Sequence, residues 1–295
     1  MSIPIFPRKM LALTALAVAI FASQLSVTQK KETTWSADEK PLSDQIHGLR
    51  ALPDDVRART TKDLALKIRQ LPMTENKLRL ATGLAGLSTE GDFGHETLQE
   101  VGKTLADTLR EKPVPAGKNG EPAFAYVELA TLVRYEHVQV ALDDPQFAEA
   151  MAGLEADDRK REHPEFALRD LTGKEWKFSD LRGKVVVVNF WATWCPPCRK
   201  EMPDLETLYE RFQSKGFVVL AISDEDAAKV TPFIHERGVT FPVLLDPGRK
   251  VNKAFIVDGI PHSFVYDREG NLVAQSIDMR TQKQFLEMLS KAGLE

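Results

Sequence analysis

The chain of 295 residues contains two cysteines, Cys195 and Cys198, which form one Cys-x-x-Cys motif. The motif follows Val185–Phe190, an apolar and largely β-branched run that is typical of a buried central strand. It precedes a predicted helix over residues 197–214. A helix N-terminus carries unpaired N–H groups and partial positive charge, and both stabilise a thiolate. We therefore expect Cys195 to be the attacking sulfur, and Cys198, one turn further and more buried, to resolve the mixed disulfide.

Structural roles for the two cysteines fit the sequence less well. A disulfide that closes so short a loop adds little stability. A structural zinc site needs about four ligands, whereas the histidines are scattered without ligand spacing, at His47, His95, His137, His163, His235 and His262. We therefore expect no metal, and no cofactor besides the redox-active disulfide of the two cysteines.

Two segments carry a resemblance to a known family. Residues 189–198 (NFWATWCPPC) resemble the active site of the TlpA/ResA/CcmG-like thioredoxins, which are bacterial, membrane-tethered reductants that face the periplasm. The segment Gly259-Ile260-Pro261 resembles the place where thioredoxin folds carry a cis-proline beside the dithiol. The resemblance covers residues 164–295 and implies a thioredoxin fold with an extra α/β insertion over residues 224–241.

The same resemblance implies an activity and partners. It implies a thiol–disulfide oxidoreductase that reduces disulfide bonds in exported proteins, and apocytochrome c cysteines are the commonest target in the family. It also implies a membrane electron donor of the DsbD/CcdA type. The direction of electron flow depends on a reduction potential, which no residue spacing reveals.

Glu201 is the third predicted catalytic residue. Plain thioredoxin has a buried aspartate where this chain has Asn189, which cannot accept a proton, and the TlpA-like group carries a glutamate where Glu201 stands. Residues three apart on a helix share a face, so Glu201 is predicted to take the proton of Cys198. The alternative is a surface glutamate that only favours the positive end of the helix.

Five residues are predicted to contact the substrate: Trp191, Trp194, Ile260, Pro261 and His262. The tryptophans and the proline are expected to form an apolar rim around the dithiol, and the backbone at Ile260 is expected to pair with an extended substrate. His262 stands where the family usually has a small polar residue. Its imidazole is predicted either to tune the thiolate near neutral pH or to be exposed and inert.

Two other functions stay open. A peroxiredoxin shares the fold but needs a Thr or Ser hydroxyl about three residues before its reactive cysteine, preceded by a proline, whereas Thr193 stands two residues before Cys195 and no proline precedes it. A non-catalytic module would bind a partner through its helices and carry a vestigial dithiol. The intact cysteine pair, Trp194 and Pro261 argue against such decay.

The first 30 residues predict export. Arg8 and Lys9 precede an apolar run over residues 10–27, which approaches the roughly 18–20 residues that a membrane span needs. An uncleaved anchor is favoured over a cleaved signal peptide, because bulky residues crowd the candidate cleavage site after Ala22. The protein is therefore expected to be anchored in the inner membrane facing the periplasm, or to be secreted to the periplasm.

Residues 35–160 predict an all-helical domain, called the helical domain below. Its leucines recur at helical spacing, and it has no tetratricopeptide signature. No function follows from its sequence. Six helices are expected, over residues 42–51, 54–70, 74–88, 94–111, 122–141 and 145–160.

The remaining residues, 164–295, predict an α/β fold with a mixed sheet. The charged stretch 155–165 is expected to end the last helix of the helical domain, with Pro164 at the boundary. A net charge of −4 with mixed signs leaves no electrostatic footprint for nucleic acid. Strands are expected over 166–168, 175–178, 185–190, 217–222, 240–245, 263–266 and 272–275, and helices over 197–214, 226–237, 251–255 and 281–292.

Overall fold

Residues 33–295 are the part of the chain that the computed structural model describes. The predicted signal peptide or anchor lies outside them. No helix within residues 33–295 is long and apolar enough to cross a membrane. Residues 35–295 belong to one compact unit, which includes both the helical domain and the C-terminal domain (residues 164–295).

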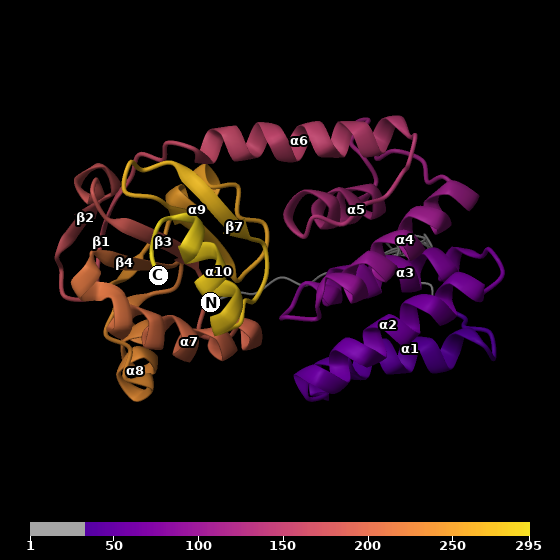
Figure 1. Cartoon of the computed structure of the whole chain (residues 1–295), viewed down its shortest axis with the longest axis horizontal. Helices are drawn as coiled ribbons and strands as arrows, with labels where there is room; N and C mark the ends of the chain where they lie inside the picture. Colours follow the sequence, from indigo (N-terminus) through magenta and orange to yellow (C-terminus); the bar gives the residue numbers. More distant parts are fainter. Residues whose placement is uncertain (1–32) are drawn as a thin grey trace, which may run out of the picture. The chain divides into compact units, whose positions relative to one another are not determined.

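The helical domain, coloured indigo to magenta in Figure 1, is built on leucine stripes. On its fourth helix Leu98, Val101, Leu105 and Leu109 recur at helical spacing and are all buried in one core. The predicted helices are confirmed apart from the end of the fifth. They are α1 (Glu39–Gly48), followed by the 3-10 helix η1 (Leu49–Ala51), α2 (Asp54–Gln70), α3 (Glu75–Ser88), α4 (His95–Glu111), α5 (Phe124–Tyr135) and α6 (Pro145–Arg161).

Helix α5 ends at Tyr135, earlier than the predicted residue 141. The chain turns at His137, whose φ is +57°, and Val138 then packs in the core against α4. Gly102 on α4 permits this close approach, because a Cβ there would lie 2.4 Å from Cγ1 of Val138. The apolar residues after α5 therefore belong to the core without being helical.

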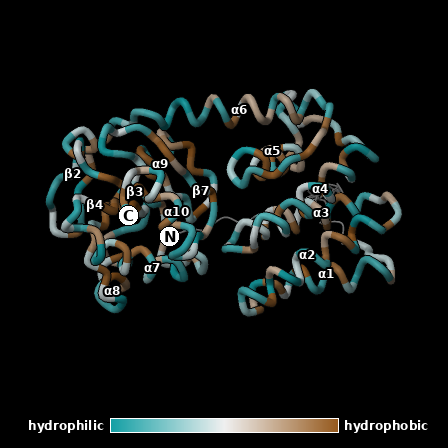
Figure 2. The backbone as a smooth tube through the Cα atoms, in the orientation of Figure 1, coloured by the Kyte–Doolittle hydropathy of each residue, from teal (hydrophilic) through white to brown (hydrophobic). Residues whose placement is uncertain are grey.

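The C-terminal domain is built on a five-stranded mixed sheet in the order β5-β4-β3-β6-β7. Every residue of β3 is buried, as its continuous apolar run predicts. In Figure 2 the tube at β3 has the brown colour of hydrophobic residues. β3 is parallel to β4 and antiparallel to β6. The strands are β3 (Val185–Phe190), β4 (Phe217–Ser223), β5 (Val243–Leu245), β6 (His262–Tyr266) and β7 (Leu272–Ser276), while β1 (Ala167–Arg169) and β2 (Glu175–Lys177) form a separate hairpin.

Helices cover both faces of this sheet. Successive residues of a strand point to opposite faces, so Val185 and Val187 pack beside the long helix after β3, while Val186 and Val188 pack in a second cluster. Asn189 therefore points to the same face of the sheet as Val185 and Val187, the face that the helix after β3 covers. The predicted thioredoxin-like fold is confirmed, with α8 in the predicted insertion. The helices are α7 (Pro196–Phe212), α8 (Ala227–Arg237), α9 (Lys250–Ala254) and α10 (Gln282–Lys291), with the 3-10 helices η2 (Phe178–Leu181) and η3 (Gln213–Lys215).

The charged end of α6 is fixed to the C-terminal domain. Arg161 is buried, and its guanidinium donates to the carbonyl oxygens of Phe255 at 2.7 Å and Ile256 at 3.0 Å. The hydroxyl of Tyr266 donates to the carbonyl oxygen of Arg161 at 2.8 Å. The chain thus enters the C-terminal domain through a packed junction.

Candidate active site

The disulfide between Cys195 and Cys198 lies where the loop after β3 enters α7. Cys195 is the N-cap of α7, and its Sγ accepts the backbone N–H of Cys198 at 3.2 Å. Pro196 and Pro197 occupy the first helical positions, where a missing N–H costs no hydrogen bond of the helix. An N–H that points at Sγ would stabilise Cys195 as a thiolate after reduction.

The two cysteines do not differ in burial. Each is 1% exposed in the disulfide, so the expectation that Cys198 is the more buried of the two is wrong for this state. Their places on α7 do differ, because Cys195 caps the helix and Cys198 lies inside its first turn. The predicted division of roles is therefore supported by helix position and not by exposure.

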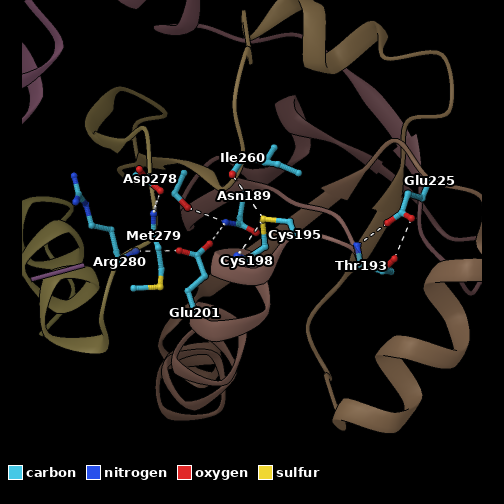
Figure 3. Close-up of a disulfide and its surroundings, with 11 residues drawn as sticks. Asn189, Thr193, Cys195, Cys198, Glu201, Glu225, Ile260, Asp278, Met279 and Arg280 are labelled. Atoms are coloured by element: carbon cyan, nitrogen blue, oxygen red, sulfur yellow. Dashed lines mark hydrogen bonds between the residues drawn. A yellow bond between two sulfur atoms is a disulfide. The ribbon is translucent and has the colours of Figure 1, made fainter. Parts of the chain in front are cut away.

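Ile260 and Pro261 lie beside the dithiol, at the start of β6. The peptide bond between them is cis, as predicted. The carbonyl oxygen of Ile260 lies 3.7 Å from Sγ of Cys195, and Figure 3 shows the two side by side. The backbone at Ile260 is thus placed where a substrate that reaches Cys195 would run, and its role in binding stays a prediction.

Glu201 lies on the buried side of α7, below the dithiol (Figure 3). Its Oε1 accepts from Nδ2 of Asn189 at 2.8 Å and its Oε2 accepts the backbone N–H of Arg280 at 3.0 Å. Burial raises the pKa of Glu201 to about 8, and these two hydrogen bonds act in the opposite direction. The alternative of a surface glutamate is therefore wrong, and a carboxyl that titrates near neutral pH is suited to proton transfer.

His262 points away from α7. Its ring stacks on Phe264, with centroids 4.4 Å apart, and Phe264 belongs to the cluster on the opposite face of the sheet from Glu201. Burial, together with the positive charges of Arg161 and Arg280, lowers the pKa of His262 to about 3. The imidazole is thus neutral near pH 7 and buried, and both expectations for it, tuning near neutral pH and exposure, are wrong.

The two tryptophans of the motif have different environments. Trp191 is 2% exposed and packs against Phe233, with ring centroids 5.6 Å apart. The prediction that it forms part of an exposed rim is therefore wrong, and Trp191 is a core residue that supports the loop. Trp194 is 66% exposed beside Cys195, which leaves it available to contact a substrate.

Glu225 is a site residue that the sequence did not reveal. Its carboxylate accepts the backbone N–H of Thr193 at 2.6 Å and the hydroxyl of Thr193 at 3.0 Å. The carboxylate therefore fixes the loop that presents Cys195. A signal was present in the sequence, because Glu225 follows β4 and the carboxyl ends of parallel strands meet at one edge of a sheet.

The segment between β7 and α10 also belongs to the site. Asp278, Met279 and Arg280 lie next to Glu201 in Figure 3, and Arg280 is buried. Burial raises the pKa of Asp278 to about 6. In sequence this segment has no motif, so only the folded chain reveals it.

Among residues 33–295, no group of three or more His, Cys, Asp or Glu side chains could hold a metal ion. The acidic groups near the dithiol are instead hydrogen-bonded by protein donors, as Glu201 and Glu225 show. The chemistry that these residues can support is thiol exchange with proton transfer.

Several known proteins are similar to the C-terminal domain. The AhpC/TSA family matches residues 160–275. Thiol-disulfide oxidoreductase ResA of Bacillus thuringiensis (strain Al Hakam) is 40% identical over 132 residues, which are 44% of this chain and 76% of the relative. ResA of Bacillus subtilis (strain 168) is 41% identical over 123 residues, which are 41% of this chain and 69% of the relative.

A solved structure is similar as well. The thiol:disulfide interchange protein, thioredoxin family protein, from Chlorobium tepidum TLS is 33% identical, over 44% of this chain and 94% of that chain, with a TM-score of 0.41. A TM-score of this size adds nothing to what the sequence relatives show.

Proposed function

Because the chain belongs to the TlpA/ResA/CcmG-like family of thiol–disulfide oxidoreductases, we propose that it reduces disulfide bonds of exported proteins through Cys195 and Cys198. The observation that carries the proposal is the position of Cys195 at the N-cap of α7, with the N–H of Cys198 on its sulfur and the carbonyl of Ile260 beside it.

The reaction proceeds in two exchanges. The thiolate of Cys195 attacks one sulfur of the substrate disulfide, and the other substrate sulfur leaves as a thiolate. Cys198 then loses its proton to Glu201 and attacks Sγ of Cys195. The second substrate thiolate leaves, and the enzyme holds the Cys195–Cys198 disulfide, so two electrons have passed to the substrate.

The oxidised enzyme needs an external source of electrons. The sequence has two cysteines and no third one that could reduce the disulfide again, so the two electrons come from a reductant outside these residues. A membrane electron donor of the DsbD/CcdA type meets this need outside the cytoplasm. Apocytochrome c cysteines are the substrate class that the family favours, and we place the enzyme in the periplasm, anchored or secreted.

A thiol peroxidase is the second candidate. Such an enzyme needs a hydroxyl aimed at its reactive sulfur, and the nearest hydroxyl in this loop belongs to Thr193. That hydroxyl donates to Glu225 at 3.0 Å, so it is already engaged away from Cys195. The geometry therefore favours a disulfide substrate over a peroxide.

Insulin reduction tests the proposal. The wild-type protein should accelerate the reduction of insulin by dithiothreitol, and Cys195→Ser should abolish the acceleration. Cys198→Ser should accumulate a mixed disulfide with substrate, visible as an added mass in non-reducing mass spectrometry, because Cys195 can still attack but nothing resolves the product.

Two outcomes would overturn the proposal that Cys195 and Cys198 reduce substrate disulfides. Trapping by Cys195→Ser in place of Cys198→Ser would reverse the two roles. Rapid consumption of hydrogen peroxide without reduction of insulin would make the protein a peroxidase. The matched control is Ser214→Ala, at an exposed residue on η3 outside the Cys195–Cys198 motif, which should reduce insulin like the wild type and trap nothing.

A further inference from the structure

Arg280 connects the site to the helical domain. Its backbone N–H donates to Oε2 of Glu201 at 3.0 Å. Its guanidinium extends into the helical domain, where Nη1 donates to the carbonyl oxygen of Thr89 at 3.2 Å and Nη2 pairs with the carboxylate of Glu136. Thr89 follows α3 and Glu136 follows α5. One residue thus contacts both the carboxylate below the dithiol and two loops of the helical domain.

A second contact fixes the same segment. The hydroxyl of Thr89 donates to Oδ2 of Asp278 at 3.0 Å, and Oδ1 of Asp278 accepts the N–H of Met279 at 2.9 Å. The segment lies between β7 and α10, outside any helix or strand. Since the segment has no strand pairing of its own, these side-chain contacts help to fix its position near Glu201.

We propose that the helical domain positions the proton acceptor of the dithiol, because Thr89 and Glu136 fix Arg280, and the backbone N–H and positive charge of Arg280 favour the charged form of Glu201. Arg280 and Glu136 are positioning residues in this scheme, and neither touches the substrate. The proposal rests on the proposed role of Glu201 in disulfide exchange. It gives the helical domain a function that the family resemblance does not cover.

The electrostatics around Glu201 support this reading. Burial raises its pKa to about 8, and the negative charge of Asp278 adds to the rise, while the N–H and the positive charge of Arg280 lower it. Loosening Arg280 should therefore move the pKa of Glu201 upward. The groups that act on Glu201 are the neutral Asn189 on β3, which donates to it, and Asp278 and Arg280 from the segment before α10. Cys198 lies one turn before Glu201 on the same helix.

The first test is Glu136→Ala, far from the dithiol in sequence. Exchange should still occur, but the midpoint of its rise with pH should move up by about one unit, which is about tenfold slower exchange at pH 7. The carbon-13 signal of the Glu201 carboxyl should titrate at the same higher pH. In a Glu201→Gln background, Glu136→Ala should change neither the rate nor the profile further.

Glu136→Ala leaves the buried guanidinium of Arg280 without its partner, which can destabilise the fold. Two more variants distinguish such misfolding from a change in the pKa of Glu201. Glu136→Gln keeps an acceptor for Arg280 and should restore the wild-type midpoint. Arg280→Met removes the guanidinium together with its charge, and should shift the midpoint upward as Glu136→Ala does.

Asp92→Asn is the matched control. Asp92 pairs with Lys283 at 2.9 Å, also between the helical domain and α10, but not through Arg280. It should leave the pH profile unchanged. An active wild type with an unchanged profile in both Glu136→Ala and Arg280→Met would overturn the proposal, whereas an inactive wild type would overturn the proposed function first.

Discussion

At the scale of single residues, the buried carboxyl near the dithiol is Glu201 on α7, whereas the central strand carries an amide, Asn189, where plain thioredoxin has an aspartate. Asn189 donates to both Glu201 at 2.8 Å and the hydroxyl oxygen of Ser263 at 2.9 Å. A neutral amide is too weak a base to take the proton of a thiol, but this one orients the carboxyl of Glu201. The proposed proton acceptor of the site, Glu201, therefore lies on α7 with Cys198 and not on the central strand.

Glu201→Gln removes that acceptor and keeps its shape. Exchange should slow by tenfold or more between pH 7 and 9, within the usual range for lost acid–base catalysis. The rise of the wild-type rate should be centred near pH 8, where the buried carboxyl loses its proton, and should disappear in the variant. Single-turnover mixing of reduced enzyme with a disulfide peptide measures both.

The fold of that variant needs its own check, by thermal unfolding at pH 6. Wild-type rates throughout this pH range in a folded Glu201→Gln protein would show that the proton of Cys198 goes elsewhere. His262 would not be the replacement, because it stacks on Phe264 on the other face of the sheet and its lowered pKa makes it a weak base.

At the scale of elements, the loop between β3 and α7 is held by the loop after β4. Glu225→Gln tests this contact, because an amide has one acceptor oxygen where the carboxylate offers two to Thr193. An unmet donor in a buried site costs about 1–3 kcal/mol. Thermal or urea unfolding should show a loss of stability in that range.

The neighbouring Asp224→Asn is the control for Glu225→Gln. Asp224 pairs with Arg249 at 3.2 Å on the surface, and such pairs contribute about 0–1 kcal/mol. Equal losses from both variants would mean that the Glu225 contact with Thr193 adds no stability beyond a surface pair.

The sequence predicts elements well where one periodicity dominates. β3 reads as a buried strand because each of its faces is covered, and α4 reads as a helix because its leucines share one face. The end of α5 was missed, since Val138 packs on α4 whether or not the chain there is helical. His262 was misplaced because one residue of strand register decides its face of the sheet.

The sequence predicts the site only for residues that lie close together along the chain. Cys195, Cys198 and Glu201 lie within seven residues and share one helix, so their spacing predicts their grouping. Glu225 meets Thr193 across 32 positions, and Arg280 meets Glu201 across 79. Contacts of this kind arise from sheet pairing and from the docking of helices, which leave no pattern in the local sequence.

At the scale of the whole molecule, carboxyl groups that are buried (Glu201) or half-buried (Glu128 and Asp278) make stability depend on pH. Burial raises the pKa of Glu128 to about 7, with the charge of Asp278 adding to the rise, and burial raises those of Asp278 and Glu201 to about 6 and about 8. A raised carboxyl pKa stabilises the fold below the unfolded pKa, and this contribution is lost as pH rises through the folded pKa.

The melting temperature should therefore fall between about pH 5 and pH 8.5. Glu128→Gln should flatten the fall and raise the melting temperature at pH 8 by about 2–4 °C, which is the effect of roughly 1 kcal/mol in a chain of this size. Scanning calorimetry across this range measures it. Glu96→Gln, at an exposed carboxylate, should leave the slope as it is, and a flat wild-type curve would contradict the prediction.

The contacts of Arg280 also bear on the order in which parts of the chain are synthesised and folded. Its partners in the helical domain lie 191 and 144 positions earlier in the chain, and contacts so distant in sequence close late in folding. Synthesis proceeds from the N-terminus, so the helical domain and both cysteines emerge before the segment whose Arg280 donates to Glu201. If Arg280 positions Glu201 as proposed, a nascent chain carries its thiols before it carries the segment that assists Cys198. Resolution by Cys198 should then stay slow until the last helix has docked.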